Sequence, residues 1–222
     1  MREETKKFVE REKVIAIVRG IDAKECLRVA DALYEGGIRM MEITFNQKKP
    51  DSFQETACAI AEIAKKYGEK MLAGAGTVTT PELVELAASA GARYIISPDV
   101  NVDVIHKTRE LGLVSMPGAM TPTEIMTAHH AGADYVKLFP TANFGVSYVK
   151  AISAPISHVK LLAVGGINEE NIADYLKAGM VGAGVGGNLV NKKYIENGEF
   201  DKITETARKL IAAVKNVEKE LS

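Results

Sequence analysis

Short runs of Val, Ile, Leu and Met recur along the whole chain, and segments with a helical pattern lie between them. The runs are "VIAIVRG" near residue 14, "IRMMEITF" near 38, "KMLAGAGTV" near 70, "ARYIISP" near 93, "LVSMPGA" near 113, "DYVKLFP" near 135, "VKLLAVGG" near 159 and "MVGAGVGG" near 181. Apolar runs of this length, rich in β-branched residues, are typical of buried strands. Their starts lie 20 to 32 residues apart, which leaves room for one strand, one helix and two loops in each repeat.

Capping residues and glycines mark the ends of the segments between these runs. Thr80 and Pro81 are typical of an N-cap and a first helical position, and several segments close on glycine. We expect helices at 24–35, 52–67, 81–90, 123–131 and 171–178. The charged segment 2–12 predicts a further helix at the N-terminus, and 200–221 predicts a long terminal helix.

The alternation of strands and helices predicts the fold class α/β. Alternation requires a parallel sheet, and eight units close naturally into a (β/α)8 TIM barrel. A doubly wound open sheet is the alternative. The length of 222 residues fits one domain, so residues 1–222 are predicted to form a single TIM barrel. The additional N-terminal helix is expected to cover the floor of this barrel.

The charge balance narrows the class of partner. With 28 basic and 29 acidic residues, the net charge of −1 provides no electrostatic footprint for nucleic acid or an anionic membrane, which favours a small-molecule partner. The first twelve residues are highly charged and no apolar stretch reaches membrane-spanning length. We therefore expect neither a signal peptide nor a transmembrane helix, and a cytoplasmic location.

The cysteines and histidines predict neither a disulfide framework nor a metal site. Cys26 and Cys58 lie in helical patterns without metal-ligand spacing, so both are expected to be core thiols. The histidines form no cluster with carboxylates at metal-ligand spacing. No metal and no cofactor are expected.

Candidate chemistry is sought at the carboxyl ends of the strands, where barrel enzymes carry their reactive groups. The polar and glycine residues at these ends are Arg19, Glu42, Thr44, Asn46, Thr77, Lys137 and the glycine pairs Gly165–Gly166 and Gly186–Gly187.

Lys137 and Glu42 stand out because the alternation of strand side chains can turn both into the barrel. Lys137 then shares a face with Tyr135 and Phe139, and Glu42 shares one with Thr44. A buried ion pair or a lysine that reaches solvent would explain this pattern. The functional alternative is a Schiff-base lysine, whose pKa must fall by ~3 units to give a neutral amine near pH 7, with Glu42 as proton shuttle.

The glycine pairs follow the seventh and eighth strands, where barrels commonly bind phosphate through backbone N–H groups. Neither pair carries a side-chain cation nearby in the pattern. A tight turn with Asn168 as a helix cap would explain the first pair equally simply. Two pairs at these two strands favour an anion site.

The motifs in order resemble the pyruvate-forming class I aldolases that cleave 2-keto-3-deoxy-6-phosphogluconate (KDPG), its galactonate epimer or 4-hydroxy-2-oxoglutarate (KHG). The resemblance runs nearly end to end, through "IAIVRG", "MEITFN", "GAGTV", "ISP", "MPGAMTPTEI", "VKLFPTANFG", "AVGGINEEN" and "GAGVGGNLV". It implies a TIM barrel, a homotrimer, and carbohydrate metabolism of the Entner–Doudoroff type.

The resemblance also implies roles for single residues. Lys137 matches the imine-forming lysine and Glu42 the general acid/base. The carboxylate of pyruvate would contact Arg19 and Thr77, Pro98 and Phe139 would shape the pocket, and the phosphate would lie on the backbone of Gly165, Gly166, Gly186 and Gly187.

Three positions depart from the gluconate-type pattern. Asn46 stands where those members carry Arg, Val164 where they carry Thr, and Asn188 where they carry Ser. The substrate carboxylate must then rely on Arg19, as in galactonate-type relatives. The lost hydroxyl at position 164 removes one hydrogen bond to the sugar, which leaves the preferred C4 epimer open.

Two other functions fit parts of the pattern. A phosphosugar isomerase or epimerase would use the same phosphate site without an imine. A non-catalytic phosphosugar-binding protein would keep Lys137 and Glu42 only as a structural pair.

Overall fold

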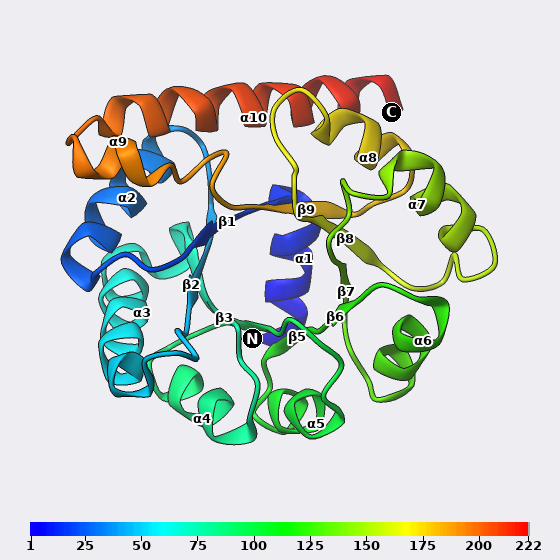
Figure 1. Ribbon diagram of the computed structural model, residues 1–222, viewed down its shortest axis with the longest axis horizontal. Helices are drawn as coiled ribbons and strands as arrows, with labels where there is room; N and C mark the ends of the chain where they lie inside the picture. The colour runs from blue at the N-terminus through cyan, green and yellow to red at the C-terminus, as the bar shows by residue number, and fades with distance from the viewer. Residues whose placement is uncertain (222) are drawn as a thin grey trace.

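The computed structural model describes residues 1–221. Short parallel strands form a ring, and helices surround it (Figure 1). The sheet has the order β5-β4-β3-β2-β1-β9-β8-β7-β6. Its strands are β1 (Val14–Val18), β2 (Met40–Thr44), β3 (Leu72–Gly76), β4 (Tyr94–Ile96), β5 (Val114–Met116), β6 (Gly118–Ala119), β7 (Val136–Leu138), β8 (Leu161–Val164) and β9 (Gly182–Val185).

The predicted fifth strand is split into β5 and β6 by Pro117, which has no N–H for a sheet hydrogen bond. β5 pairs with β4, and β6 pairs with β7. The carbonyl of Pro117 still accepts a hydrogen bond from the backbone N–H of Lys137 at 2.8 Å. The two ends of the sheet therefore belong to one continuous segment of chain. The barrel prediction is confirmed and the open sheet is excluded.

Helices follow the strands as expected. They are α1 (Arg2–Glu12), α2 (Ala23–Glu35), α3 (Phe53–Tyr67), α4 (Pro81–Ser89), α5 (Val102–Glu110), α6 (Pro122–His130), α7 (Gly145–Ser153), α8 (Ile172–Lys177), α9 (Lys192–Glu196) and α10 (Phe200–Leu221), with 3-10 turns at Pro50–Ser52 and Gly68–Lys70. The Thr80 hydroxyl caps α4 by accepting from the N–H of Leu83, as the sequence predicts.

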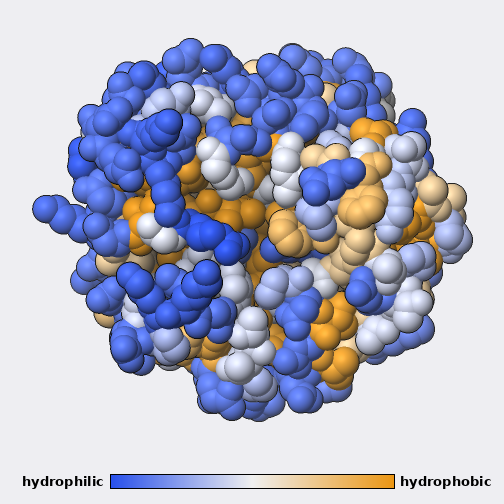
Figure 2. Space-filling view, in the orientation of Figure 1, coloured by the Kyte–Doolittle hydropathy of each residue, from blue (hydrophilic) through white to orange (hydrophobic). Residues whose placement is uncertain are grey.

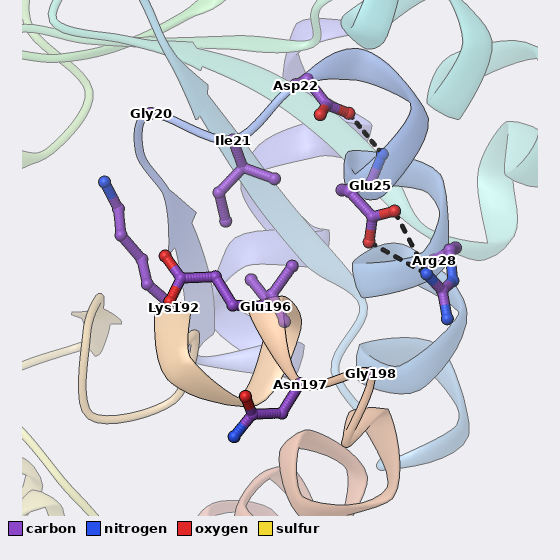
Figure 3. A pocket seen from close by; sticks show the side chains of 10 residues that line it. Gly20, Ile21, Asp22, Glu25, Arg28, Lys192, Glu196, Asn197 and Gly198 are labelled. Atoms are coloured by element: carbon purple, nitrogen blue, oxygen red, sulfur yellow. Dashed lines mark hydrogen bonds and ion pairs between the residues drawn. The ribbon is translucent and has the colours of Figure 1, made fainter.

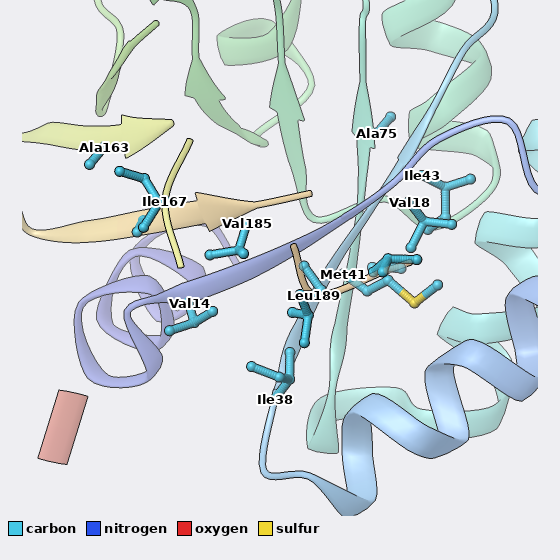
Figure 4. Close-up of a cluster of buried hydrophobic side chains, with 14 of the residues drawn as sticks. Val14, Val18, Ile38, Met41, Ile43, Ala75, Ala163, Ile167, Val185 and Leu189 are labelled. Atoms are coloured by element: carbon cyan, nitrogen blue, oxygen red, sulfur yellow. The ribbon is translucent and has the colours of Figure 1, made fainter. Parts of the chain in front are cut away.

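Apolar side chains pack in two separate layers. The outer layer lies between strands and helices and includes Val18, Met41, Ile43 and Val185 (Figure 4). The inner layer fills the barrel, and its buried members are Val9, Ile15, Met40, Leu72, Tyr94, Ile96, Val114, Met116, Tyr135 and Leu162.

Helix α1 covers the amino-terminal ends of the strands, since its Val9 packs in the inner layer. Arg2 holds α1 in place, because its Nε donates to Oδ2 of Asp134 at 3.1 Å just before β7. The hydroxyl of Tyr135 donates to Oε1 of Glu10 at 2.9 Å on the same helix. The prediction that the first helix covers the barrel floor is confirmed, and the opposite end remains for a functional site.

The cysteine prediction is half wrong. Cys26 is buried in α2, where desolvation raises the pKa of its thiol to about 12. Cys58 is exposed on α3, because its neighbours Ala57 and Ala59 take the inward positions of that helix.

Among residues 1–221, none of the helices combines the length and the apolar character that a membrane span needs.

Candidate active site

Lys137 and Glu42 both project into the barrel. Lys137 lies on β7 two residues after Tyr135, and Glu42 lies on β2 two residues after Met40, and both of these neighbours belong to the inner apolar layer. The Lys137 side chain is 6% exposed and that of Glu42 is 1% exposed. Two ionisable groups therefore share one largely desolvated space above the apolar floor.

Strand β3 makes the room that Glu42 occupies. Its inward positions at this level are Gly74 and Gly76, and Gly76 pairs in register with Thr44. A Cβ atom added to Gly76 would lie 1.6 Å from Oε1 of Glu42. The carboxylate therefore rests directly on the backbone of β3, which explains the small residues of "GAGTV".

Burial pushes the two groups toward their neutral forms. Desolvation raises the pKa of Glu42, while Lys137 and Arg19 oppose that rise. Desolvation also lowers the pKa of Lys137, with Glu42 opposing the shift and Arg19 adding to it. Neither carboxylate oxygen of Glu42 has a hydrogen-bond partner among the described residues, so the pair is not joined by a direct ion-pair hydrogen bond. This arrangement favours a nucleophilic amine and a carboxyl group able to exchange protons.

One side of the barrel mouth is polar. Arg19, Thr44, Asn46 and Thr77 line a common pocket above β1, β2 and β3. Thr77 has a left-handed backbone with φ of 55°, unusual for a β-branched residue. The Oδ1 of Asn46 accepts from the N–H of Lys48 at 3.1 Å, so its amide oxygen is used within its own loop.

The other side is apolar. The ring of Phe139 is 43% exposed, and its centroid lies 4.9 Å from Nζ of Lys137. A Cβ atom on Gly165 would lie 3.1 Å from the same ring. Phe139 therefore lies between the amine and the first glycine pair. Pro98 is exposed after β4, and its carbonyl closely approaches Gly118. Figure 2 shows a central hollow with apolar side chains inside it and hydrophilic ones around much of its rim.

The first glycine pair requires glycine for its backbone shape. Gly165 and Gly166 have φ of 95° and 77°, which side-chain-bearing residues rarely adopt. Val164 precedes the pair and is buried at the end of β8.

The second glycine pair is more open. Among residues 1–221, no atom would lie within 4 Å of a Cβ on Gly187, and only Ile17 would approach one on Gly186. The side-chain N–H of Asn188 donates to the carbonyl of Ile167 at 2.9 Å. Asn188 thus connects the loops that carry the two glycine pairs.

A family model described as "KDPG and KHG aldolase" matches residues 5–206. The chain belongs to the KDPG and KHG aldolase family. It is an aldolase, a carbon–carbon lyase, as the resemblance in sequence predicts.

Named relatives agree with this assignment. The chain is 38% identical to the 2-dehydro-3-deoxy-6-phosphogalactonate aldolase of Escherichia coli K12, over 79% of this chain and 83% of the relative. It is 32% identical to the 2-dehydro-3-deoxy-phosphogluconate aldolase of Haemophilus influenzae, over 91% and 93%. A solved KDPG aldolase from Legionella pneumophila, with pyruvate captured as a covalent carbinolamine, superposes with a TM-score of 0.82 at 28% identity and covers 92% of this chain and 97% of its own.

Three further residues lie near the carboxyl ends of the strands, and the sequence pattern does not single them out. Lys192, which follows the second glycine pair, lines the same pocket as Arg19, and its Nζ would lie 3.1 Å from a Cβ on Gly20 (Figure 3). Lys192 therefore adds a side-chain cation to the polar side of the mouth, beside Gly20. Gln47 donates to the carbonyl of Thr77 at 2.8 Å. The hydroxyl of buried Thr141 accepts from the N–H of Val164 at 3.0 Å, so it joins the ends of β7 and β8.

No group of three or more His, Cys, Asp or Glu residues within 1–221 is arranged to hold a metal ion.

Proposed function

We propose that this aldolase is a class I enzyme that forms an imine on Lys137 and cleaves a 2-keto-3-deoxy-6-phospho sugar acid to pyruvate and glyceraldehyde 3-phosphate. The observation that carries the proposal is a buried lysine whose pKa is lowered by desolvation, facing a buried carboxyl group across the barrel. A lysine that only formed a structural ion pair would be expected to contact its carboxylate, and Glu42 lacks such a contact.

The reaction begins when the neutral amine of Lys137 attacks the C2 ketone. Loss of water from the carbinolamine gives an iminium ion, and Glu42 supplies and receives the protons that these steps require. The iminium is an electron sink. When Glu42 accepts the proton of the C4 hydroxyl, the C3–C4 bond breaks, the aldehyde leaves, and the bonding electrons form an enamine. Protonation of the enamine and hydrolysis of the imine release pyruvate and restore the amine.

Substrate groups on either side of the scissile bond fit the two sides of the mouth. Arg19 and Thr77 line the polar pocket and would bind the carboxylate next to C2. The backbone of the glycine pairs would bind the phosphate, and the Phe139 ring spans the distance from the amine to Gly165. Lys192 adds a cation to this mouth.

We infer a galactonate-type preference at C4. Asn46 replaces the arginine of gluconate-type members, Val164 lacks a hydroxyl, and the E. coli relative that is 38% identical is named for the galactonate compound. KHG, which forms pyruvate and glyoxylate, is a further substrate candidate for the same lysine. A homotrimer is proposed on the resemblance in sequence, and the exposed ring of Phe144, which packs against Tyr148 with ring centroids 5.1 Å apart, is an apolar group that an interface between subunits could cover. The charge pattern and the lack of a membrane-spanning helix among residues 1–221 support a cytoplasmic location.

Borohydride trapping tests the proposal. The protein is incubated with pyruvate and borohydride, and intact mass and peptide mapping locate any adduct. We expect one reduced pyruvate on Lys137, no adduct in Lys137→Ala, and normal labelling in the matched control Lys160→Ala, whose lysine is exposed and paired with Glu10. An unlabelled wild-type protein at high pyruvate would instead support the isomerase or the binding protein, neither of which forms an imine.

A further inference from the structure

Tyr94 carries a second buried polar group that has no partner in the barrel. Its side chain is 0% exposed on β4, and its hydroxyl makes no hydrogen bond of ordinary geometry to the described residues, although the backbone of Met41 lies near it. Both oxygens of Glu42 also lack a partner. Buried polar groups in native proteins are nearly always hydrogen-bonded. Two such groups in one interior therefore require a common explanation.

The glycines of β3 bring these two side chains together. Gly74 pairs in register with Glu42 on one side, and the pairing of Ala75 with Ile95 aligns Gly74 with Tyr94 on the other. A Cβ atom on Gly74 would lie 2.1 Å from Cε2 of Tyr94, and one on Gly76 would lie 1.6 Å from Oε1 of Glu42. Both side chains thus lie flat across the same strand, and the Tyr94 ring leans over β3 toward β2.

We propose that the hydroxyl of Tyr94 donates a hydrogen bond to the Glu42 carboxylate through one internal water molecule, and so makes Glu42 easier to ionise. Tyr94 is then a positioning residue that acts on the reaction through Glu42. The proposal rests on the acid–base role assigned to Glu42 above. The water bridge is physically reasonable because a buried water needs two or more polar partners, and the three unpartnered oxygens supply them.

The charged and titratable groups around Glu42 explain why a neutral donor is useful there. Lys137 faces Glu42 from β7 and Arg19 faces it from the segment after β1, and both favour its ionised form. Lys137 changes charge during the proposed cycle, so its support for the carboxylate varies. Burial first, and then the charge of Glu42, hold the pKa of Tyr94 well above its usual value, so Tyr94 keeps its proton throughout. Tyr94 is therefore a donor of constant charge.

Tyr94→Phe removes this donor and keeps the ring. We would label glutamate side chains with ¹³C at the carboxyl carbon, identify the Glu42 resonance by its loss in Glu42→Gln, and titrate it. We expect the pKa of Glu42 to rise by about one unit in Tyr94→Phe, and the acidic limb of kcat/KM to move by the same amount. Replacing Tyr94 with 3-fluorotyrosine, a more acidic donor, should shift both in the opposite direction.

Tyr135→Phe is the matched control, because Tyr135 is also buried in the barrel but donates to Glu10 on α1. It should lower stability without moving the Glu42 titration. If Glu42 titrates at the same pH in Tyr94→Phe and wild type, or moves equally in Tyr135→Phe, the inference is overturned. Failure of the proposed function would show differently, as undiminished turnover in Glu42→Gln.

Discussion

Gly76→Ala tests whether catalysis depends on the glycine surface of β3. The added Cβ would lie 1.6 Å from Oε1, 2.4 Å from Cδ and 2.6 Å from Cγ of Glu42. An ordinary contact is about 3.5 Å, so the carboxylate must move by about 2 Å or β3 must shift. Because the three nearest atoms all belong to the side chain of Glu42, we expect the side chain to move and the strand to stay.

This displacement sets the expected magnitudes. Misplacing a reacting group by about 1 Å can cost on the order of 100-fold in rate, so kcat/KM should fall at least that much. Overpacking a core costs about 1–3 kcal/mol in the free energy of unfolding. Each kcal/mol should lower Tm by about 2–4 °C in a domain of this size.

A double-mutant cycle assigns the cost to Glu42. Cleavage is followed by coupling pyruvate release to NADH oxidation, and stability by chemical denaturation. In the Glu42→Ala background, the stability cost of Gly76→Ala should disappear, because the clashing carboxylate is gone. A Gly76→Ala enzyme with kcat/KM within about two-fold of wild type would refute the reasoning, since less than 1 Å of misplacement would then be implied.

Three further outcomes are expected. Glu42→Gln should raise Tm at neutral pH. The pKa of Glu42 is raised in the folded protein, so its carboxyl group costs the fold stability as pH rises above the ordinary glutamate pKa of about 4.3. The gain in Tm over wild type should therefore shrink as the pH of paired thermal melts is lowered toward that value. Arg2→Met should lower the free energy of unfolding by about 1.5–3 kcal/mol in urea titrations while kcat stays unchanged, because it removes the nearer of the two cations, Arg2 and Lys6, that face the side chain of Asp134. Gly166→Ala should raise KM for the phosphorylated substrate and spare pyruvate trapping, because its Cβ would lie 2.5 Å from that of Ala142 at φ of 77°.

Much of the fold could be predicted from periodicity. The alternation of apolar runs and capped segments predicts the barrel, and the predicted helices agree with the observed ones to within one or two residues. The break at Pro117 was missed because the apolar run continues across it, although a missing N–H is visible in the sequence. Cys58 was placed wrongly because a single helical residue between buried alanines has little influence on the pattern.

The candidate site could likewise be predicted only in part from the sequence. Lys137 and Glu42 could be found because strand alternation places both in the barrel and charged residues are rare there. Lys192 is the first residue of α9, after the loop that follows β9, so only the folded chain brings it beside Gly20. Nothing in the sequence marks Tyr94, because its relation to Glu42 depends on how strands far apart in sequence pair across Gly74.

The desolvation that makes the amine of Lys137 reactive in the free enzyme also prepares the site for the later cleavage of the C3–C4 bond. Burial favours a neutral Lys137 and a protonated Glu42, the pair of states needed for amine attack and for loss of water from the carbinolamine. Once the iminium forms, its nitrogen carries a positive charge. That charge stabilises the Glu42 carboxylate and lowers its pKa at the moment when a base must take the C4 hydroxyl proton. In the proposed mechanism, one buried pair therefore serves as nucleophile and acid first, and as electron sink and base afterwards, because bond formation at Lys137 changes the field at Glu42.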